Sequence, residues 1–412
     1  MVGIAKSVPA SFCMPAAEDA ENQEQSRQHY LPTPTDMLLK ILLVIDDYVT
    51  SNNGTTISCR RFASELRRQG HEVKILGIGN PNDPDIYSLP PYRLPVFDRL
   101  VRANDFVFAG IDMQTIRKAV EWADIVHCMM PFKLTYTTIQ TANVLQTPVT
   151  AGFHIQPENL LSAVHLGKCA LANRLLYAMW RKAIYDKAEH IHVPSHFMRE
   201  QLLAHGYKGD IRAISNGISD LFKWQPKYKT HASEGKIIIT MIGRLSREKR
   251  QDLLIKAASY SKYSSKIQLV FAGKGPLEQH YREMGKQLPK PPLFLFLSPE
   301  GLLDILAQTD LYVHASDMES EAIACIEAFA TGLVPVISDS ALSATSQFAL
   351  DERSLFRAGD AKDLARKMDY WIEHPQEKHE MEHAYAQKGL EYALETSVRQ
   401  CVQMFEDAIR EQ

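Results

Sequence analysis

Short apolar runs alternate with helical stretches along most of the chain, and this alternation constrains the fold more than any other sequence feature. The first run, residues 38–45, is apolar apart from one lysine, and residues 73–77 repeat the pattern. Between them, residues 57–69 place their apolar side chains on one helical face. Nearly continuous apolar strands joined by helices are typical of parallel sheets that are covered on both faces. The sequence therefore predicts an α/β protein.

The alternation breaks once, at the polar residues 218–235, and restarts at residue 236. A chain of 412 residues is too long for one ordinary core, so two or three domains are expected. We predict two Rossmann-like domains, residues 37–217 and 236–390, joined by the polar linker. Residues 391–412 are predicted to form a C-terminal helix.

The first 36 residues differ from the rest of the chain. They contain four prolines, an acidic polar centre and no apolar periodicity. Such a segment cannot bury enough apolar surface to offset the cost of ordering, so residues 1–36 are predicted to be a disordered extension. The apolar part near the start is interrupted by proline and is too short for a secretory signal.

Composition and charge exclude several classes of protein. An apolar content of 45% and a charged content of 23% are typical of a soluble globular protein, and no apolar run approaches the length of a membrane span. Residues 37–215 carry 20 basic and 16 acidic side chains. That surplus is too small to indicate nucleic-acid binding, although it is compatible with contact to an anionic membrane surface as well as with ordinary scatter.

The cysteines show no CxxC spacing and no nearby histidine pairing, so neither a zinc site nor a disulfide framework is predicted, and a reducing cytoplasm is the expected location. The six are Cys13, Cys59, Cys128, Cys169, Cys325 and Cys401.

Residues 314–339 carry the densest set of candidate site residues. Glu319 and Glu327 stand eight positions apart, so a helix that begins at Ser320 would place both carboxylates near one face, and Gly332 would end it. Apolar strand-like runs flank this helix. Ligands bind outside the carboxyl ends of such strands, where helix N-termini attract anions. The stretch predicts a ligand with a phosphate and hydroxyl groups.

The two acids admit other interpretations. They could form a general acid and base pair, as in glycosidases, or belong to a capped helix with a solvated face. Glu327 lies in the apolar sequence CIEAF, where an unpaired carboxylate would be costly to bury. We therefore expect a hydroxyl or cationic partner for Glu327.

Cations and glycines follow other strands of the second domain. Arg244 and Lys249 come after the strand that ends at Gly243, and they could converge on a diphosphate or simply be solvated. Gly273 and Gly275 form a second glycine turn after the next strand. Such turns are common for geometric reasons alone.

The first domain offers a glycine loop and a histidine. Gly54 lies in the loop after the first strand, without the GxGxxG pattern of dinucleotide dehydrogenases. His154 follows a buried strand, at the edge where ligand-binding residues collect, although a lone histidine is often structural. Glu158 is an equal candidate on the acceptor side.

Taken together, these motifs resemble the retaining glycosyltransferases of family 4, which have the GT-B fold. The Asn-Gly loop, His154, the GR and EK residues, the Gly-Lys-Gly turn and the E-x7-E pair occur in the family's order, over roughly residues 38–410. The resemblance implies two Rossmann-like domains that face each other across a cleft, with C-terminal helices that cross back to the first domain.

The resemblance also implies roles for individual residues. Arg244 and Lys249 would hold the donor diphosphate, and Glu327 would bind the ribose hydroxyls. Glu319 and His154 would hold the donor sugar, and Gly54 would let the first loop close over the phosphates. No metal or other cofactor is expected, because these cations and a helix dipole would stabilise the leaving UDP.

One stretch departs from the family pattern. The family commonly has glycines after the first glutamate, whereas this chain has Ser320, Glu321 and Ala322. Their backbone groups are still expected to bind the donor, provided that the Glu321 carboxylate points away from the phosphates.

The sequence AGFHIQPENLL and the basic, aromatic helix after it resemble bacterial diacylglycerol glucosyltransferases, and residues 93–108 add an amphipathic stretch. This likeness implies transfer of a hexose, with UDP-glucose as the expected donor, to a lipid or glycolipid at the inner face of the cell membrane. The alternatives are synthesis of a polysaccharide or lipid-linked oligosaccharide, a nucleotide-sugar binding protein without turnover, and a GT-B epimerase.

Overall fold

The computed structural model describes residues 37–49, 54–92, 107–162, 166–167 and 169–412, of which 38–412 form one compact unit. The predictions for residues 1–36, and for most of residues 93–108, lie outside the described residues.

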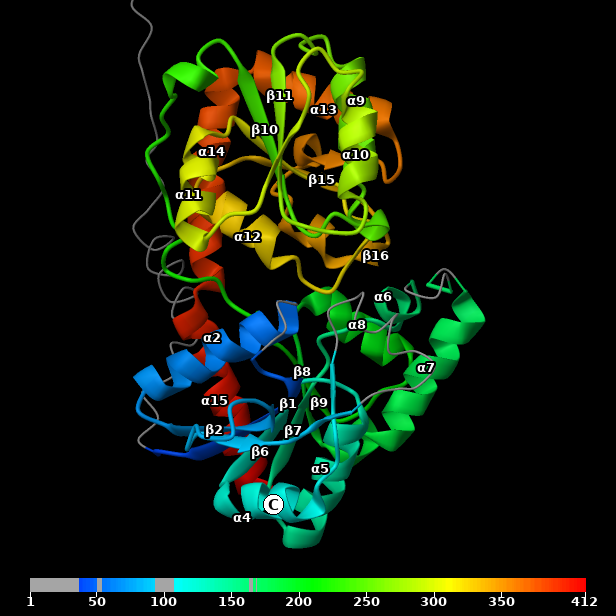
Figure 1. The fold of residues 1–412 in the computed structure, drawn as a ribbon, viewed down its shortest axis with the longest axis vertical. Helices are drawn as coiled ribbons and strands as arrows, with labels where there is room; N and C mark the ends of the chain where they lie inside the picture. Colours follow the sequence, from blue (N-terminus) through cyan, green and yellow to red (C-terminus); the bar gives the residue numbers. More distant parts are fainter. Residues whose placement is uncertain (1–36, 50–53, 93–106, 163–165, 168) are drawn as a thin grey trace, which may run out of the picture. The chain divides into compact units, whose positions relative to one another are not determined.

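A parallel sheet of seven strands forms the first half of this unit (Figure 1). Its strands are β1 (Lys40–Asp47), β2 (Glu72–Ile78), β3 (Ile86–Ser88), β6 (Ile125–Cys128), β7 (Val149–Gly152), β8 (His190–Val193) and β9 (Asp210–Ala213). The helices of this half are α2 (Gly54–Arg68), α4 (Met113–Trp122), α5 (Lys133–Leu145), α6 (Pro157–Ser162), α7 (Ala170–Ala183) and α8 (His196–Ala204). Two short strands, β4 (Pro91–Tyr92) and β5 (Phe108–Ala109), form a separate antiparallel pair.

A parallel sheet of six strands forms the second half. Its strands are β10 (Ile237–Ile242), β11 (Ile267–Ala272), β12 (Leu293–Leu295), β13 (Leu311–His314), β15 (Pro335–Ser338) and β17 (Leu355–Phe356). Its helices are α9 (Gln251–Tyr260), α10 (Glu278–Gly285), α11 (Pro299–Gln308), α12 (Ile323–Ala330), α13 (Ala361–Glu373) and α14 (Pro375–Gly389).

The strand order reverses at the same place in both sheets. The orders are β3-β2-β1-β6-β7-β8-β9 and β12-β11-β10-β13-β15-β17, so the chain changes direction beside the first strand of each half. In open α/β sheets the ligand crevice lies outside the carboxyl ends of the strands at this switch point. The topology therefore points to the loops after β10 and β13.

The last helix, α15 (Leu394–Arg410), returns to the first half (Figure 1). Its buried residues, among them Val398, Val402 and Phe405, belong to the first core, whereas α13 and α14 contribute to the second core. The predicted fold of two parallel α/β sheets with a returning C-terminal helix is confirmed.

The polar stretch between the halves packs along the second half. Among its described residues, its regular structure is one short 3-10 helix, η2 (His231–Ser233). The stretch is held to α11 by the backbone amide of Tyr228, which donates to the carbonyl of Ala307 at 3.1 Å. The Trp224 ring stacks on His383. A Cβ at Gly332 would lie 2.6 Å from that indole, and its φ of +89° also favours glycine. Two constraints therefore require glycine at the predicted end of α12.

The helix that was predicted to begin at Ser320 begins at Ile323 instead. Glu319 lies in a short strand, β14 (Met318–Glu319), which pairs with β16 (Leu342–Ser343). Ala322 then adopts a left-handed conformation with φ of 72°, where the family commonly has glycine. The argument that Glu319 and Glu327 share a helical face is therefore wrong.

Candidate functional site

A cavity of about 1890 Å³ is lined by residues from both halves. It lies at the strand ends that the topology indicates. The predicted site residues on its wall are Gly54, His154, Arg244, Lys249, Glu319, Ser320, Glu321 and Ala322. Among the described residues that line it, the predicted Gly273, Gly275 and Glu327 do not appear.

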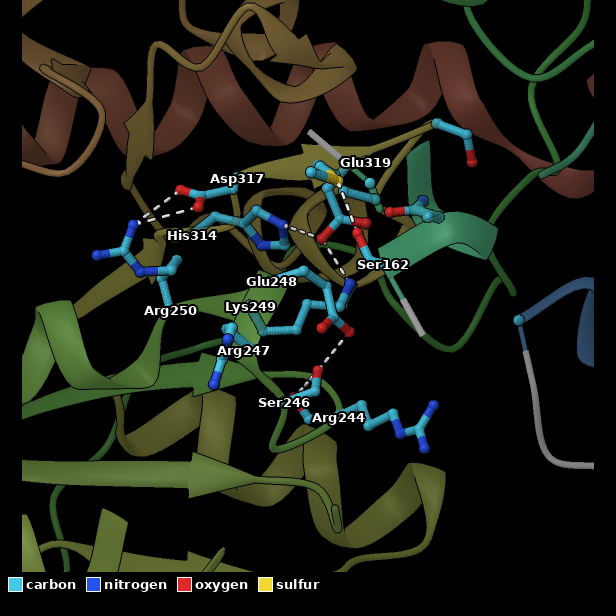
Figure 2. Close-up of a pocket in the computed structure, with 18 of the residues that line it drawn as sticks. Ser162, Arg244, Ser246, Arg247, Glu248, Lys249, Arg250, His314, Asp317 and Glu319 are labelled. Carbon is cyan, nitrogen blue, oxygen red and sulfur yellow. Dashed lines mark hydrogen bonds and ion pairs between the residues drawn. The ribbon is translucent and has the colours of Figure 1, made fainter. Parts of the chain in front are cut away.

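The Lys249 ammonium and the Glu319 carboxylate form the centre of the site (Figure 2). Lys249 Nζ lies 2.5 Å from Glu319 Oε1, and the buried ring of His314 places Nε2 2.9 Å from the same oxygen. Burial alone would raise the pKa of Glu319, but Lys249 and His314 hold it well below its usual value. The site therefore keeps a buried anion and an adjacent cation.

The loop that carries Lys249 is fixed at both ends. Ser246 Oγ donates to Glu248, while Arg250 Nη1 lies 3.0 Å from Asp317 Oδ1, as Figure 2 shows. The Arg250 backbone adopts the left-handed conformation, with a φ of 60°. These contacts tie the loop after β10 to the segment after β13, so the Lys249 ammonium is positioned before any ligand binds.

The glycine turn after β11 supports the same loop. A Cβ at Gly273 would lie 2.1 Å from the carbonyl oxygen of Gly243, and one at Gly275 would lie 2.3 Å from that of Leu245. No side chain fits at these distances. The turn thus holds the backbone around Arg244, and contact of its glycines with the donor stays a prediction.

The Glu321 side chain contacts the segment that follows β9, the last strand of the first half. Its carboxylate accepts hydrogen bonds from Ser215 Oγ at 2.5 Å and from Asn216 Nδ2 at 2.6 Å, and the Asn216 backbone amide lies 3.1 Å from both oxygens. Burial raises the pKa of Glu321 to about 7, against the effect of these donors. Both oxygens are held by protein groups, and contact of Glu321 with the donor stays a prediction.

The raised pKa predicts how stability depends on pH. Folding lifts the pKa of Glu321 from 4.5 to about 7, so the folded protein binds the proton more tightly and stability falls as pH rises through this interval. In Glu321→Gln this loss is absent. Its free energy of unfolding, relative to wild type, should rise by about 3 kcal/mol between pH 4.5 and pH 8 in urea titrations. A stability difference that stays constant with pH would contradict the raised pKa of Glu321. Glu283→Gln, at an exposed position on α10, is the control.

His154 lies on the first-half wall of the cavity, after β7. Its ring is buried, and neither ring nitrogen has a hydrogen-bond partner among the described residues. Burial, with a smaller contribution from the nearby His192, lowers the pKa of His154 well below its usual value. His154 is thus a neutral ring with unused hydrogen-bonding capacity. Glu158, by contrast, accepts from Tyr177 Oη at 3.2 Å and is absent from the described cavity lining.

Glu327 has the cationic partner that its apolar setting requires. Arg61 Nη2 of α2 lies 2.9 Å from Glu327 Oε1 of α12, so the pair joins the two halves. Burial nevertheless raises the pKa of Glu327, with Arg61 opposing the effect. The expectation of a hydroxyl or cationic partner is confirmed, while binding of ribose by Glu327 stays a prediction.

A family model described as "Glycosyltransferase Family 4" matches residues 52–220, and one described as "Glycosyl transferases group 1" matches residues 222–389. The matches together cover every strand of the two sheets except β1, and the residues that line the cavity. The chain belongs to the family 4 glycosyltransferases. The predicted GT-B fold is confirmed by solved structures as well: the UDP-glucose complex of Anabaena Alr3699/HepE is 16% identical, with a TM-score of 0.67, over 90% of this chain and 100% of that one.

Two relatives carry names that describe different reactions. A GDP-mannose-dependent alpha-mannosyltransferase of Corynebacterium glutamicum is 26% identical over 321 residues, which cover 74% of this glycosyltransferase and 73% of the relative. An alpha-monoglucosyldiacylglycerol synthase of Streptococcus pneumoniae is 26% identical over 325 residues, which cover 73% and 71%.

A possible metal-ligand group lies apart from the cavity. His127, His192 and Cys401 are buried in the first core, and one potential ligand atom from each lies within 4.8 Å of the others. None of the three lines the described cavity. The candidate site around Lys249 and Glu319 therefore has no contribution from this group.

Sequence reasoning missed several residues of the candidate site. His314, Asp317 and Asn216 line the cavity, and Arg61 pairs with Glu327. Asn216 and His314 each stand at or just past a strand end, as His154 does, so the same positional rule could have found them. The Arg61 pairing joins positions 266 apart in the chain, and no local signal indicates it.

Proposed function

We propose that this glycosyltransferase moves a hexose from a nucleotide sugar to a hydroxyl of a membrane lipid, with retention of anomeric configuration. One observation carries the proposal: the cavity has a cationic region and an apolar wall. Lys249 and Arg244 line it on the second half, whereas Ile155, Leu160 and Leu161 line it on the first half. A charged donor and an apolar acceptor would meet in the space between these surfaces.

The cationic region suits the donor diphosphate. Lys249 and Arg244 supply positive charge, and α12 begins at the cavity with no side chain that caps its first turn. Free N–H groups at a helix N-terminus and fixed cations stabilise the charge that develops on a leaving diphosphate. In the proposed reaction the bond from the anomeric carbon to the phosphate oxygen breaks, the acceptor oxygen bonds to that carbon on the same face, and the departing phosphate takes the acceptor proton. No metal is required in this scheme.

UDP-glucose is the proposed donor and GDP-mannose is the alternative. The first is supported by the resemblance to diacylglycerol glucosyltransferases, and the second by the related mannosyltransferase. A donor screen that includes UDP-glucose, UDP-galactose and GDP-mannose separates them.

An exposed apolar face lies on α7, outside the described cavity lining. On α7, next to α6, Leu171, Leu175 and Met179 are 68%, 62% and 56% exposed at helical spacing. Arg174 and Lys182 lie among them on the same face. Apolar side chains flanked by cations are typical of helices that lie on anionic bilayers. In the described part of the chain, no helix combines the length and apolar character needed to cross a bilayer.

The α7 face provides a direct prediction. Replacing Leu171, Leu175 and Met179 together with glutamine should lower sedimentation with anionic vesicles, and transfer to lipid in those vesicles, at least tenfold, because each partly inserted side chain loses up to about 2 kcal/mol of apolar burial. Transfer to a short-chain, water-soluble analogue of the same lipid should change little. Val144→Gln on α5, where valine is 81% exposed, is the matched control. Equal losses on both acceptors would contradict a membrane role for this face.

The proposed acceptor is tested by product mass. The enzyme is incubated with each donor and either extracted membrane lipids, including sterols and diacylglycerol, or soluble glycans. A hexose added to a lipid supports the proposal. Label only in soluble glycans favours the polysaccharide or oligosaccharide alternative, and donor binding without any product favours a binding protein.

A further inference from the structure

Three side chains from separate segments meet in the core of the first half. His127 lies in β6, His192 lies in β8, and Cys401 lies on α15, the helix that returns to this half. Their exposed fractions are 0%, 1% and 0%, and one potential ligand atom from each lies within 4.8 Å of the others. Imidazole nitrogens and a cysteine sulfur are ligands for zinc and copper. This buried group lies outside the described cavity lining, and the proposed function does not use it.

The sheet register and α15 bring the buried group together. In the parallel register, His127 lies beside Thr150 of β7. Two residues further along β7, Gly152 lies beside His192. Alternate residues of a strand share a face, so the two histidines lie on the same face of the sheet. Phe405, one helical turn after the cysteine, has its ring centroid 5.3 Å from that of His127, so α15 covers the histidines and brings the cysteine to them.

Each histidine has one ring nitrogen engaged and the other without a partner. His192 Nε2 lies 2.8 Å from the Ile214 carbonyl oxygen, which can only accept, so Nε2 carries the proton and Nδ1 carries the lone pair. His127 Nδ1 lies 2.8 Å from Thr150 Oγ1, and the Thr150 hydroxyl has the Val126 carbonyl as its own acceptor at 3.5 Å. The hydroxyl oxygen can therefore accept from Nδ1–H, which leaves the lone pair on Nε2. Among the described residues, neither lone-pair nitrogen has a partner.

The two free lone pairs require a partner. A buried acceptor without a donor costs stability, and the Cys401 thiol has one proton, so it can satisfy one nitrogen at most. A metal ion that binds both nitrogens and the sulfur satisfies all three atoms at once. Histidines that bind metals usually donate their other ring N–H to a nearby oxygen, and both rings have that contact here. The hydrogen bonding around the rings therefore agrees with a metal site.

Coordination number and charge decide which ion fits. The group offers three ligands among the described residues, and structural zinc sites almost always have four. A divalent ion bound to one thiolate and two neutral imidazoles would leave a net positive charge in the core, at high cost. With copper(I) the thiol proton passes to the buffer, and the ion, one thiolate and two imidazoles together carry no net charge. A soft thiolate ligand also favours copper(I).

We propose that His127, His192 and Cys401 form a buried copper(I) site that holds α15 on the sheet of the first half. The site has a structural role apart from sugar transfer, and it does not depend on the proposed function. Because an ion that binds only the folded state stabilises that state, copper-loaded protein should have a higher Tm than copper-free protein.

Copper content tests the site. The full chain is produced in cells grown with added copper, because a site closed to solvent is loaded during folding, and it is then equilibrated with a copper(I) chelator. Elemental mass spectrometry should find about one copper per chain in wild type and at least tenfold less in Cys401→Ser, since loss of a ligand should weaken binding more than the roughly 10- to 100-fold cost of losing an outer partner. Cys59→Ser, at a buried cysteine of α2, is the matched control and should retain copper.

Three results of this experiment would overturn the copper site. The first is wild-type protein that holds no copper after growth with added copper. The second is Cys401→Ser with the copper content of wild type. The third is zinc in place of copper, lost in Cys401→Ser, which would overturn the choice of ion.

The outer partner and the ligand atoms are tested separately. Thr150→Val removes the hydroxyl that holds His127 and should lower copper affinity about 10- to 100-fold in competition with the same chelator. X-ray absorption at the copper edge of wild type should show nitrogen as well as sulfur ligands. Sulfur ligands alone would indicate binding at exposed thiols and would overturn the site. This spectrum needs no variant, so it decides the question even if Cys401→Ser does not fold.

Discussion

Replacing Lys249 with alanine is expected to lower turnover about 10²- to 10³-fold, as removal of one preorganised electrostatic donor does in other enzymes. The Lys249 ammonium lies on the cavity wall 2.5 Å from Glu319, with its side chain 21% exposed. Under the proposed function, its loss removes a charge that would stabilise the departing diphosphate, and it leaves His314 as the remaining side-chain partner of Glu319 among the described residues. The measurement is kcat at saturating donor.

The Lys249 prediction has a matched control. Lys274 follows β11 and places its ammonium 3.9 Å from the Phe296 ring centroid, and it is absent from the described cavity lining. Lys274→Ala should therefore turn over within about threefold of wild type, since surface substitutions have small effects. Wild-type transfer by Lys249→Ala would refute the diphosphate assignment.

Replacing Arg61 with methionine is expected to destabilise the protein by about 3 kcal/mol at pH 8, because it leaves the buried Glu327 carboxylate without its cation. Burial already raises the pKa of Glu327, and removal of Arg61 raises it further. A raised folded-state pKa lowers stability as pH increases, so the loss should be smaller at pH 5 than at pH 8. Urea unfolding at both pH values measures it.

A second substitution separates charge from packing in this pair. The double variant Arg61→Met/Glu327→Gln removes the unpaired carboxylate and should recover most of the stability that Arg61→Met loses. Equal destabilisation of the single and double variants would show that the Arg61 side chain acts through packing, and would contradict the charge argument.

The positions of strands and helices were predicted from the sequence more accurately than the side chains that bind the glutamates. The apolar run at residues 73–77 was predicted as a strand and lies within β2, because nearly continuous apolar runs mark buried parallel strands. The break at residues 218–235 was predicted from its polar composition, whereas the return of α15 to the first half was implied by the resemblance to family 4. Glu319 was misplaced because Met318 and Glu319 pair with a strand that is distant in sequence, and the left-handed Ala322 then delays the helix.

The partners of Glu321 and Glu327 could not be predicted from the local sequence. The apolar sequence around Glu327 requires a partner, but only the fold brings Arg61 of α2 to it. For Glu321 the sequence indicated only that its carboxylate should avoid phosphate. Its bonds to Ser215 and Asn216 join residues more than 100 positions apart and depend on how the two halves pack.

The proposed reaction of the cavity around Lys249 and Glu319 is retaining transfer of a hexose to a lipid hydroxyl. The most direct measurement is proton NMR of the glycolipid formed from isotope-labelled UDP-glucose, or from GDP-mannose if that donor is used. Retention predicts one added hexose in the α configuration, the same as in the donor. A β-linked product, or release of free sugar with no glycolipid, would contradict it.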